Sequence, residues 1–347
     1  MAGREQLIES ILNGLDNAPG DPNRTTIFIG ARGTGKTALL SKIADEAESR
    51  GWVSANVTAV SGMLEDVIQR SVESAKEFAE KQNVNRITSL SAFGFSFTRK
   101  VTDEPKGNWR TQMNRILDEL NAQGIGLLIT VDEVGADTDE MRVLAAAFQH
   151  FVRERRNTAL IMAGLPQQVS ALLSDKKISF LRKAFQHYLD PIPLYEVRDA
   201  MRRTVELSGR KIGKQALDAA TNATGGFPFL IQLTGYHVWR QHAERAEISP
   251  GDVTAGVEYA RADMEKMIFR RTLDELSDGD RAFLDAMSVD EKESRLSDIK
   301  DRLGVSSNYA NQYRIRLIEQ GIIGSRGRGK LGFEIPMLRD YLRSGGE

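Results

Sequence analysis

The chain has 347 residues, enough for two or three domains, and its 41% hydrophobic and 27% charged residues are typical of a folded protein rather than a disordered one. Its 47 basic and 48 acidic residues give a formal charge of -1. This balance excludes a global electrostatic attraction to nucleic acid or anionic lipid. Any such attraction must come from a local patch of basic residues.

The sequence predicts a soluble, cytoplasmic protein without a membrane partner. There is no cysteine, which excludes disulfides, zinc ribbons and thiol nucleophiles and favours a reducing compartment. The first residues, MAGREQLIES, place charges where a signal peptide needs an apolar run. No uninterrupted apolar stretch approaches about 18 residues, the length that a membrane-spanning helix needs.

The amino-terminal half predicts alternating helices and strands. Apolar residues at helical spacing over 5–15 are followed by short apolar strand patterns, each with a helical pattern after it. The predicted strands are 25–30, 52–60, 126–134 and 158–166, and the predicted helices after the first are 38–51, 62–83, 108–123 and 138–156. A small hairpin or insertion is predicted over 87–101. Such alternation is typical of an α/β fold, a parallel sheet with helices on both faces.

The second half predicts mainly helices. Helical patterns cover 195–208, 214–223, 228–244 and 250–271, with glycine and proline between them. The last segment reads as helix, helix, turn, helix and a glycine-rich hairpin. The predicted domains are therefore an α/β domain over 1–192, a helical domain over 193–271 and a third domain over 272–347.

A phosphate-binding loop is the strongest motif. Residues 30–37, GARGTGKT, fit G-x-x-x-x-G-K-[ST] at every fixed position and lie between a predicted strand and a predicted helix. The glycines let backbone N–H groups converge on phosphate oxygens, and the helix N-terminus favours the same anion. Lys36 is expected to reach the β- and γ-phosphates, and Thr37 to offer its hydroxyl to Mg²⁺. The other predicted nucleotide-binding residues of this loop are Gly30, Gly33, Thr34, Gly35 and Ala38. A chance glycine-rich turn is the alternative.

Two carboxylates end the buried strand pattern LLITVDE. Asp132 is expected to help hold Mg²⁺ from the side opposite Thr37, and Glu133 to orient and polarise the attacking water. A chain that only bound nucleotide would not need the glutamate, so the pair predicts ATP hydrolysis. Alternatively, the two acids simply cap the end of a strand.

With these motifs, most of the chain resembles an AAA+ ATPase, between the origin-recognition/initiator-type ATPases and the STAND class of regulatory NTPases. Gly3-Arg4-Glu5 is similar to the G-R-E element of those families, which implies that Arg4 lies near the adenine; a solvated charged start is the alternative. Arg182 falls where AAA+ proteins often carry an arginine that approaches the γ-phosphate, sometimes of a neighbouring subunit. It could equally be a surface arginine on an amphipathic helix.

The sequence also departs from the AAA+ pattern at two sensor positions. Initiator-type relatives often have G-D-x-R where this chain has Gly225-Gly226-Phe227-Pro228, and Pro228 resembles the G-x-P proline that packs near the adenine in the STAND class. The strand at 158–166 has Ala163-Gly164 where many AAA+ proteins keep a polar sensor. These departures favour a slow nucleotide switch over fast mechanical work.

The carboxyl-terminal segment resembles a winged helix-turn-helix. Gly304 lies in its turn, Ser306 caps its second helix and SRGRGKLGFEI, residues 325–335, is its wing. Residues 302–343 hold eight basic residues and three acids, an excess that suits phosphate contacts. The predicted DNA-contact residues are Asn308, Asn311, Arg314 and Arg316 on the second helix and Arg326, Arg328 and Lys330 on the wing.

The resulting hypothesis is a regulatory ATPase with ATP and Mg²⁺ as cofactors, whose nucleotide state controls binding of double-stranded DNA by the winged helix. Its predicted catalytic residues are Lys36, Glu133 and Arg182. One alternative is a STAND-like signalling ATPase whose winged helix contacts only protein, through self-association or a partner. Another is a transposition or phage-related helper ATPase.

Overall fold

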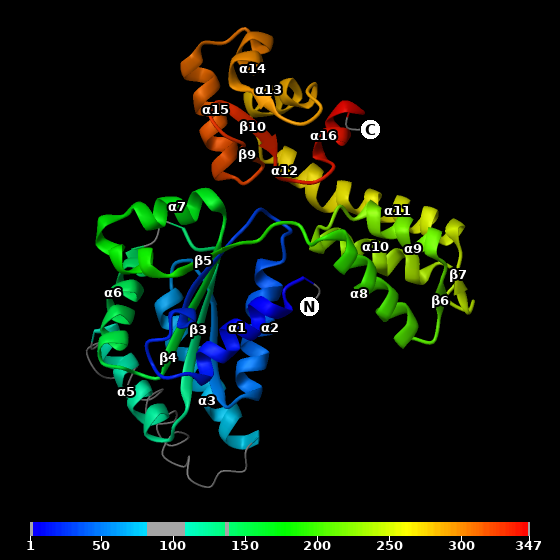
Figure 1. Cartoon of the computed structure of the whole chain (residues 1–347). Coiled ribbons are helices and arrows are strands. Elements are labelled where there is room, and N and C mark those ends of the chain that lie inside the picture. The colour runs from blue at the N-terminus through cyan, green and yellow to red at the C-terminus, as the bar shows by residue number, and fades with distance from the viewer. Residues whose placement is uncertain (1–2, 82–107, 136–138, 346–347) are drawn as a thin grey trace. The chain divides into compact units, whose positions relative to one another are not determined.

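The computed structural model describes residues 3–81, 108–135 and 139–345 (Figure 1). The hairpin predicted over 87–101 lies outside these described residues. The chain packs as two units: residues 6–30 and 36–188 form the first, here called the sheet unit, and residues 1–5, 31–35 and 189–347 form the second, here called the helical unit. Among the described residues, no helix combines the length and the apolar character needed to cross a bilayer.

A five-stranded parallel sheet forms the centre of the sheet unit, in the order β2-β3-β4-β1-β5. Its strands are β1 (Thr25–Ile29), β2 (Trp52–Thr58), β3 (Gly126–Asp132), β4 (Thr158–Gly164) and β5 (Phe185–Tyr188). Its helices are α1 (Glu5–Asp16), α2 (Lys36–Ser49), α3 (Met63–Lys81), α5 (Trp109–Ala122), α6 (Asp139–Arg153) and α7 (Pro166–Ser174), with short 3₁₀ segments at Pro22–Arg24 and Lys176–Lys183. The predicted α/β class is confirmed, although the edge strand β5 was not predicted.

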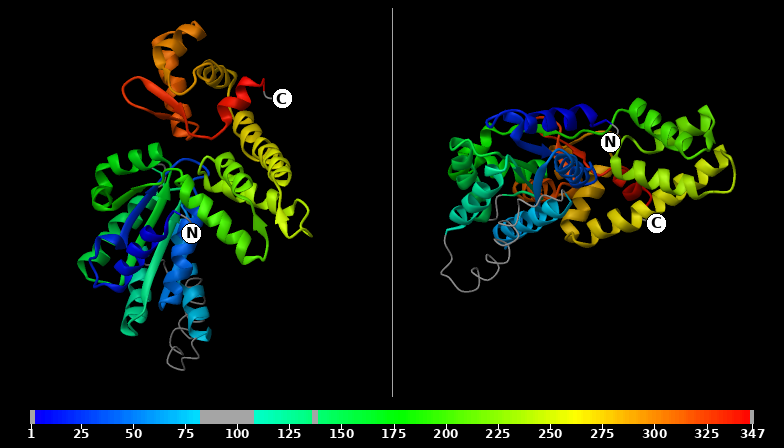
Figure 2. Two further views of the ribbon diagram at one scale, coloured as in Figure 1. Left: turned by 45° about the vertical axis from the view of Figure 1, so that its right-hand side comes forward. Right: turned by 90° about the horizontal axis from the view of Figure 1, so that it is seen from below.

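Helices cover both faces of this sheet (Figures 1 and 2). Alternate strand residues, such as Ile27 in β1 and Ile129 in β3, pack into one core with Val67 of α3, Met113 of α5 and Phe148 of α6. Helices α1 and α2 lie on the opposite face (Figure 1). Both faces are therefore buried, and this burial explains why the strands read as continuous apolar runs rather than alternating ones.

The helical unit begins with a four-helix bundle. Its helices are α8 (Leu194–Leu207), α9 (Lys214–Ala223), α10 (Pro228–Arg240) and α11 (Pro250–Met264). They enclose a core that includes Val205, Val238 and Val253. Two strands of two residues each, β6 (Lys211–Ile212) and β7 (Glu247–Ile248), pair beside it. The sequence analysis found no strand signal after residue 193, because a two-residue strand is too short to show periodicity.

The rest of the helical unit, here called the C-terminal module, follows a short π-helix (Glu265–Phe269) and α12 (Arg270–Asp274). Its elements are α13 (Asp278–Ser288), β8 (Ser294–Arg295), α14 (Leu296–Leu303), α15 (Ser307–Glu319), β9 (Ile323–Ser325), β10 (Lys330–Phe333) and α16 (Leu338–Arg343). Gly304 takes the left-handed conformation at the end of α14, and Ser306 caps α15, as the sequence predicts. The antiparallel order β8-β10-β9 places the hairpin turn at 326–329.

The core of the C-terminal module extends beyond the module itself. Phe283, Ile299 and Leu317 of the module share one buried cluster with Leu230, in the first turn of α10. Phe229, also in that turn, packs partly buried against the same cluster. Helix α10 is thus apolar on two faces, one toward the bundle core and one toward the module.

Candidate nucleotide site

The predicted phosphate loop connects β1 to α2. Strand β1 ends at Ile29, which is 2% exposed, and α2 begins at Lys36. Gly33 and Gly35 have φ values of 80° and 83°, a region that L side chains rarely adopt. The ammonium group of Lys36 donates a hydrogen bond to the Gly30 carbonyl over 2.8 Å, which folds the lysine side chain back along the loop.

The two predicted metal-binding side chains lie in direct contact. Asp132 is the last residue of β3, and Thr37 is the second residue of α2. The hydroxyl of Thr37 donates a hydrogen bond to the Asp132 carboxylate, although the two residues are 95 positions apart in the sequence. A hydroxyl and a carboxylate oxygen held together in this way are donors that Mg²⁺ prefers.

Glu133 follows with an uncommon backbone conformation. Its φ is 56°, in the left-handed region, and its backbone N–H donates to the second carboxylate oxygen of Asp132 over 2.8 Å. The next residue, Val134, returns to the sheet by donating to the Ala163 carbonyl over 2.9 Å. Left-handed non-glycine residues cost free energy and cluster at functional sites. The Glu133 side chain is exposed in this turn.

Two glycines in the segments that depart from the AAA+ sensor pattern are closely packed. A Cβ atom at Gly164, the last residue of β4, would lie 2.7 Å from the Val134 carbonyl oxygen. A Cβ atom at Gly226 would lie 2.2 Å from the Ile192 carbonyl oxygen, and Gly226 has a φ of 79°. Each of these two glycines therefore excludes a side chain unless the backbone moves, whereas the arginine of the G-D-x-R pattern would fall at Pro228.

Arg4 and Pro228 both belong to the helical unit. The guanidinium of Arg4 donates to the Asp190 carbonyl, and burial lowers the pKa of Arg4 while the charges of Asp190 and Glu196 oppose that shift. Pro228 is the first residue of α10, a position where its missing N–H costs nothing. The preceding turn is fixed by a 2.8 Å hydrogen bond from the Ile192 N–H to the Gly226 carbonyl.

Arg182 lies in the 3₁₀ segment after α7 rather than in an amphipathic α-helix. Its Nε donates to the Leu173 carbonyl over 2.7 Å, and its guanidinium also bonds the Ser174 carbonyl over 3.3 Å. These are the last carbonyls of α7, where a cation offsets the negative end of the helix dipole. The structure thus gives Arg182 a capping contact within the sheet unit.

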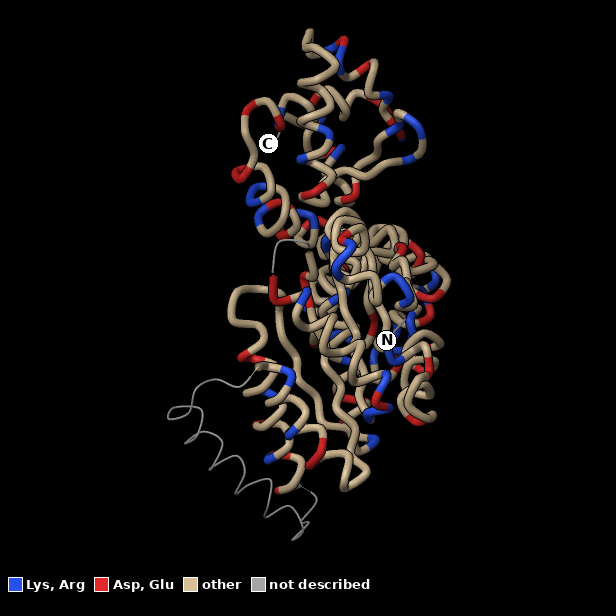
Figure 3. Tube along the Cα trace, turned by 90° about the vertical axis from the view of Figure 1, so that its left-hand side faces the viewer, with Lys and Arg blue, Asp and Glu red and all other residues tan. Residues whose placement is uncertain are grey.

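Most basic side chains predicted to contact DNA are paired inside the C-terminal module. Arg316 binds the buried Asp280 over 2.6 Å, Arg326 binds Glu334 over 2.5 Å and Lys330 binds Glu293 over 3.0 Å. Basic and acidic positions are interspersed along the trace of the module (Figure 3). The excess counted over 302–343 therefore overstates the free positive charge, since Asp280 and Glu293 lie before that range.

Four predicted contact residues keep polar groups at the surface of the module. Asn308 is exposed at the start of α15, and the Arg314 guanidinium bonds the Asn311 side chain over 2.7 Å. Arg328 is exposed in the turn between β9 and β10. Within the described part of the chain, neither Arg314 nor Arg328 forms an ion pair with an acid. This subset is therefore the better candidate for phosphate contacts.

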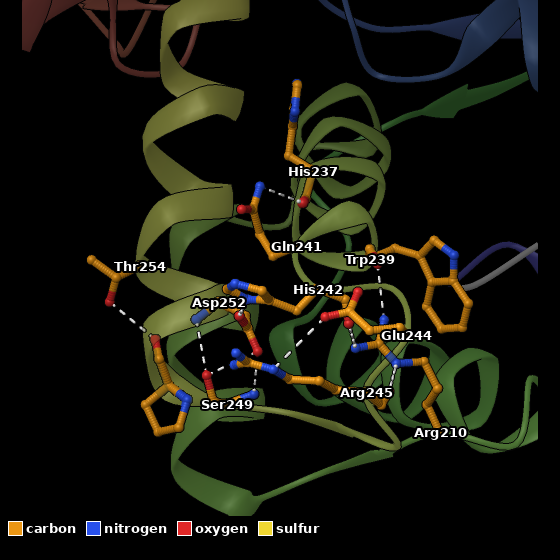
Figure 4. Close-up of polar contacts among 11 residues, drawn as sticks. Arg210, His237, Trp239, Gln241, His242, Glu244, Arg245, Ser249, Asp252 and Thr254 are labelled. Atoms are coloured by element: carbon orange, nitrogen blue, oxygen red, sulfur yellow. Dashed lines mark hydrogen bonds and ion pairs between the residues drawn. The ribbon is translucent and has the colours of Figure 1, made fainter.

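The two histidines of the helical bundle have separate carboxylate partners. His237 Nε2 lies 2.7 Å from Asp263, and His242 Nδ1 lies 2.6 Å from Asp252 (Figure 4). Across the residues that the structure describes, no three histidine, cysteine, aspartate or glutamate side chains gather as a metal site. Asp252 also closes a capping box by accepting hydrogen bonds from the Ser249 N–H and hydroxyl, each over 2.8 Å.

This capping box predicts a pH-dependent step in stability. Burial raises the pKa of Asp252, but the hydrogen bonds from His242 and Ser249 outweigh it and lower the pKa from 3.8 to about 2. Because the folded-state pKa is the lower one, the stabilisation is present above about pH 4 and is lost as the pH falls toward 2. Asp252→Ala is expected to lower the free energy of unfolding by about 1 kcal/mol at pH 7. The difference from the parent protein should shrink between pH 4 and pH 2.

Trp239 fluorescence, recorded in a background with Trp52→Phe and Trp109→Phe, reports urea unfolding of this bundle at each pH. Thr254→Ala is the matched control, because the Thr254 hydroxyl also bonds within the first turn of α11, to the Pro250 carbonyl, but does not titrate. A difference between Asp252→Ala and the parent protein that stays constant down to pH 2 would contradict the assignment.

Sequence reasoning missed the apolar residues that flank Pro228. Phe227 and Phe229 pack against the core of the C-terminal module, and Leu230 is buried in it at 3% exposure. Their spacing was a usable signal, since a helix with apolar residues on two faces needs two partners.

Comparisons with known proteins agree with this architecture. Residues 266–342 match a family model described as a domain of unknown function (DUF8462). No curated protein matches the chain in sequence. The fold is similar to the Walker-type ATPase PABY2304 of Pyrococcus abyssi, with a TM-score of 0.73 and 16% identity over 99% of this chain and 96% of that one.

Two further solved structures are also similar in fold. The ORC2 protein of Aeropyrum pernix, solved in complexes with ADPNP and ADP, has a TM-score of 0.63 and 14% identity, covering 99% of this chain and 93% of that one. The Cdc6p protein of Pyrobaculum aerophilum has a TM-score of 0.50 and 15% identity, covering 98% of this chain and 92% of that one.

The fold and the loop between β1 and α2 define a P-loop ATPase architecture. More particularly, the fold is similar to those of the ORC2 and Cdc6p proteins, which confirms at the level of the fold the resemblance inferred from the motifs.

Proposed function

We propose that this chain is a regulatory ATPase that binds ATP with Mg²⁺ at the loop between β1 and α2 and hydrolyses it slowly. The observation that carries the proposal is the hydrogen bond between Thr37 and Asp132, which joins the two halves of the predicted metal site. It is supported by the Lys36 ammonium group, which lies along the same loop. Isothermal titration with ATP in the presence and absence of Mg²⁺ tests it, and the absence of any heat of binding would refute it.

Each side chain has a defined task in this proposal. The loop N–H groups and the Lys36 ammonium bind the phosphates, and their positive charge stabilises negative charge that develops on the γ-phosphate. Thr37 and Asp132 would hold Mg²⁺, which neutralises phosphate charge when bound. Glu133 accepts a proton from the attacking water and orients it.

Slow turnover is proposed from the two departures from the AAA+ sensor pattern. Ala163-Gly164 and Pro228 stand where many AAA+ proteins keep polar side chains that detect the γ-phosphate, and a Cβ atom at Gly164 would clash with the Val134 carbonyl. Fewer groups then stabilise the transition state, so the barrier to hydrolysis is higher. A long-lived nucleotide state suits a switch, in which ATP and ADP favour different conformations.

We further propose that the C-terminal module binds double-stranded DNA in a manner that depends on the bound nucleotide. Support comes from the order α14, turn, α15, hairpin, which is that of a winged helix, and from polar groups of Asn308, Arg314 and Arg328 at its surface. A titration with labelled duplex tests this proposal, run with ATP, with ADP and with neither at two salt concentrations. We expect affinity to differ between nucleotides and to fall steeply with salt.

Charge reversal at the unpaired arginines should weaken this binding. The double variant Arg314→Glu and Arg328→Glu is expected to lower duplex affinity by at least about 10-fold, since two phosphate contacts become repulsive. Arg271→Glu, an exposed charge reversal on α12, is the matched control and should bind as the parent protein does. Equal affinity of the double variant and the control would count against a DNA interface on this face.

One observation favours a second candidate function, a STAND-like signalling ATPase whose module contacts only protein. Arg316, Arg326 and Lys330 are already neutralised by acids of the module, and the module shares its core with α10. In that case nucleotide would change self-association or partner binding without any DNA. Light scattering with ATP and with ADP distinguishes the two candidates.

A further inference from the structure

The helical bundle contains an apolar cavity of about 520 Å³ between α8 and α10. Ile212 and Ile248 of the two-residue strands also line it, and the cavity is open on one side, where Thr204, Ser208 and Gly235 are exposed. The cavity lies entirely within the helical unit and shares no lining residue with the nucleotide site. Its volume falls in the range of about 300–1,000 Å³ that is typical of small-molecule sites.

Small residues on both helices keep this cavity open. Helix α8 contributes Ala200 and Thr204, one turn apart, to one wall, and α10 contributes Ile231, Gly235 and Val238 to the other. Gly235 is at the centre of the α10 wall, because Ile231 and Val238 lie one turn to either side of it.

Neither backbone conformation nor packing explains the glycine at position 235. Gly235 does not have a positive φ, and a Cβ atom built on it would meet nothing within 4 Å. Glycine in the middle of a helix lowers stability relative to alanine, so this position carries a cost without any gain in the packing of the chain itself. Gly235 is exposed, and the missing side chain leaves space at the open side of the cavity beside α8.

The lining chemistry restricts what the cavity can hold. None of its fifteen lining residues is charged. The Thr204 hydroxyl is already bonded to the Ala200 carbonyl of its own helix, and the Ser208 hydroxyl to the Val205 carbonyl. A charged group inserted here would lose part of its hydration without gaining a counter-ion from the lining residues, which is unfavourable.

Two arginines close in sequence to lining residues are also committed elsewhere. Arg210 donates to the carbonyls of Trp239, His242 and Arg245 (Figure 4). Arg240 donates to the hydroxyl of Tyr236. Because both guanidinium groups already have these partners, neither is expected to pair with an anionic ligand in the cavity.

We propose that this cavity binds a neutral, apolar small molecule, with an alkyl chain or aromatic ring system inserted between α8 and α10 beside Gly235. The volume of about 520 Å³ suits a small molecule, whose apolar part would contact the lining while one side stays open to solvent. The inference is independent of the ATPase proposal, because no residue of the nucleotide site takes part.

Fluorescence titration with N-phenyl-1-naphthylamine, a neutral apolar probe, tests the inference on the full chain. The parent protein should bind one probe with enhanced emission. Gly235→Leu, which fills the space, should weaken binding at least 10-fold, and Ala200→Leu should do the same from the opposite wall. Gly251→Leu is the matched control, because Gly251 is an exposed helical glycine of α11 outside the cavity.

Two further measurements separate the inference from its rivals. Gly235→Leu should melt no lower than the parent protein, because leucine favours helix and fills a void. Decanol should displace the probe at least 10-fold better than decanoate, and the Lys36→Ala variant should bind the probe like the parent.

Several results would overturn the inference. These are failure of the parent protein to bind the probe, binding that survives both filling variants, equal displacement by decanoate, or loss of probe binding in Lys36→Ala. The last result would place the probe at the nucleotide site instead.

Discussion

Replacing Lys36 by alanine is expected to abolish measurable ATP binding. The Lys36 ammonium group lies along the phosphate loop, 2.8 Å from the Gly30 carbonyl, and would contact the β- and γ-phosphates. A hydrogen bond to a charged group is worth about 1.5–3 kcal/mol, so the loss of two such contacts weakens binding by more than about 100-fold. Equilibrium binding of a fluorescent ATP analogue measures the effect.

Lys42→Ala is the matched control for this variant. Lys42 lies on the same helix, α2, and pairs with Glu46 at the surface over 2.7 Å. Removing it deletes one positive charge from the same helix without touching the loop, so nucleotide affinity should be unchanged. If Lys36→Ala binds ATP as tightly as Lys42→Ala does, the loop is not the nucleotide site.

Glu133→Gln is expected to retain ATP binding and to lose turnover by about 10²–10⁴-fold, the range for removal of a general base. Glutamine keeps the size of the side chain and the left-handed turn, since its backbone N–H can still donate to Asp132. It cannot accept the proton of the attacking water. Single-turnover hydrolysis, measured beside ATP affinity, separates the chemical step from binding.

Glu65→Gln serves as the control, since Glu65 is an exposed acid in the first turn of α3. Its hydrolysis rate should equal that of the parent protein. Normal hydrolysis by Glu133→Gln would show that another group activates the water. Loss of ATP binding in the same variant would instead give Glu133 a role in holding the nucleotide.

Sequence periodicity predicted the sheet and its helices because both faces of the sheet are buried, which produces long apolar runs. It did not predict β5, whose residues Phe185–Tyr188 are mostly exposed at the sheet edge and show no such run. The predicted helix over 250–271 continues past the end of α11 at Met264 as a short π-helix. This local change of hydrogen bonding leaves the apolar spacing nearly intact.

The nucleotide loop could be predicted because its residues are contiguous and their chemistry is restrictive. The contact of Thr37 with Asp132 was also predictable, since the carboxyl ends of parallel strands meet at one edge of the sheet. The acidic partners of the basic residues in the C-terminal module could not be predicted. Arg316 and Lys330 are neutralised by acids 36 and 37 positions upstream, and a local count of charges cannot include such distant partners.

The shared core of α10 and the C-terminal module has a mechanical consequence. Burying a leucine such as Leu230 stabilises a protein by about 1.5–3 kcal/mol, and Phe229 adds to that attachment. Pro228 lies between Phe227 and Phe229, which both pack against the module core. A ligand that displaced Pro228 would therefore also displace the module. For the same reason, a fragment that begins at residue 266, where the family model begins, would lack Phe229 and Leu230, which belong to its hydrophobic core.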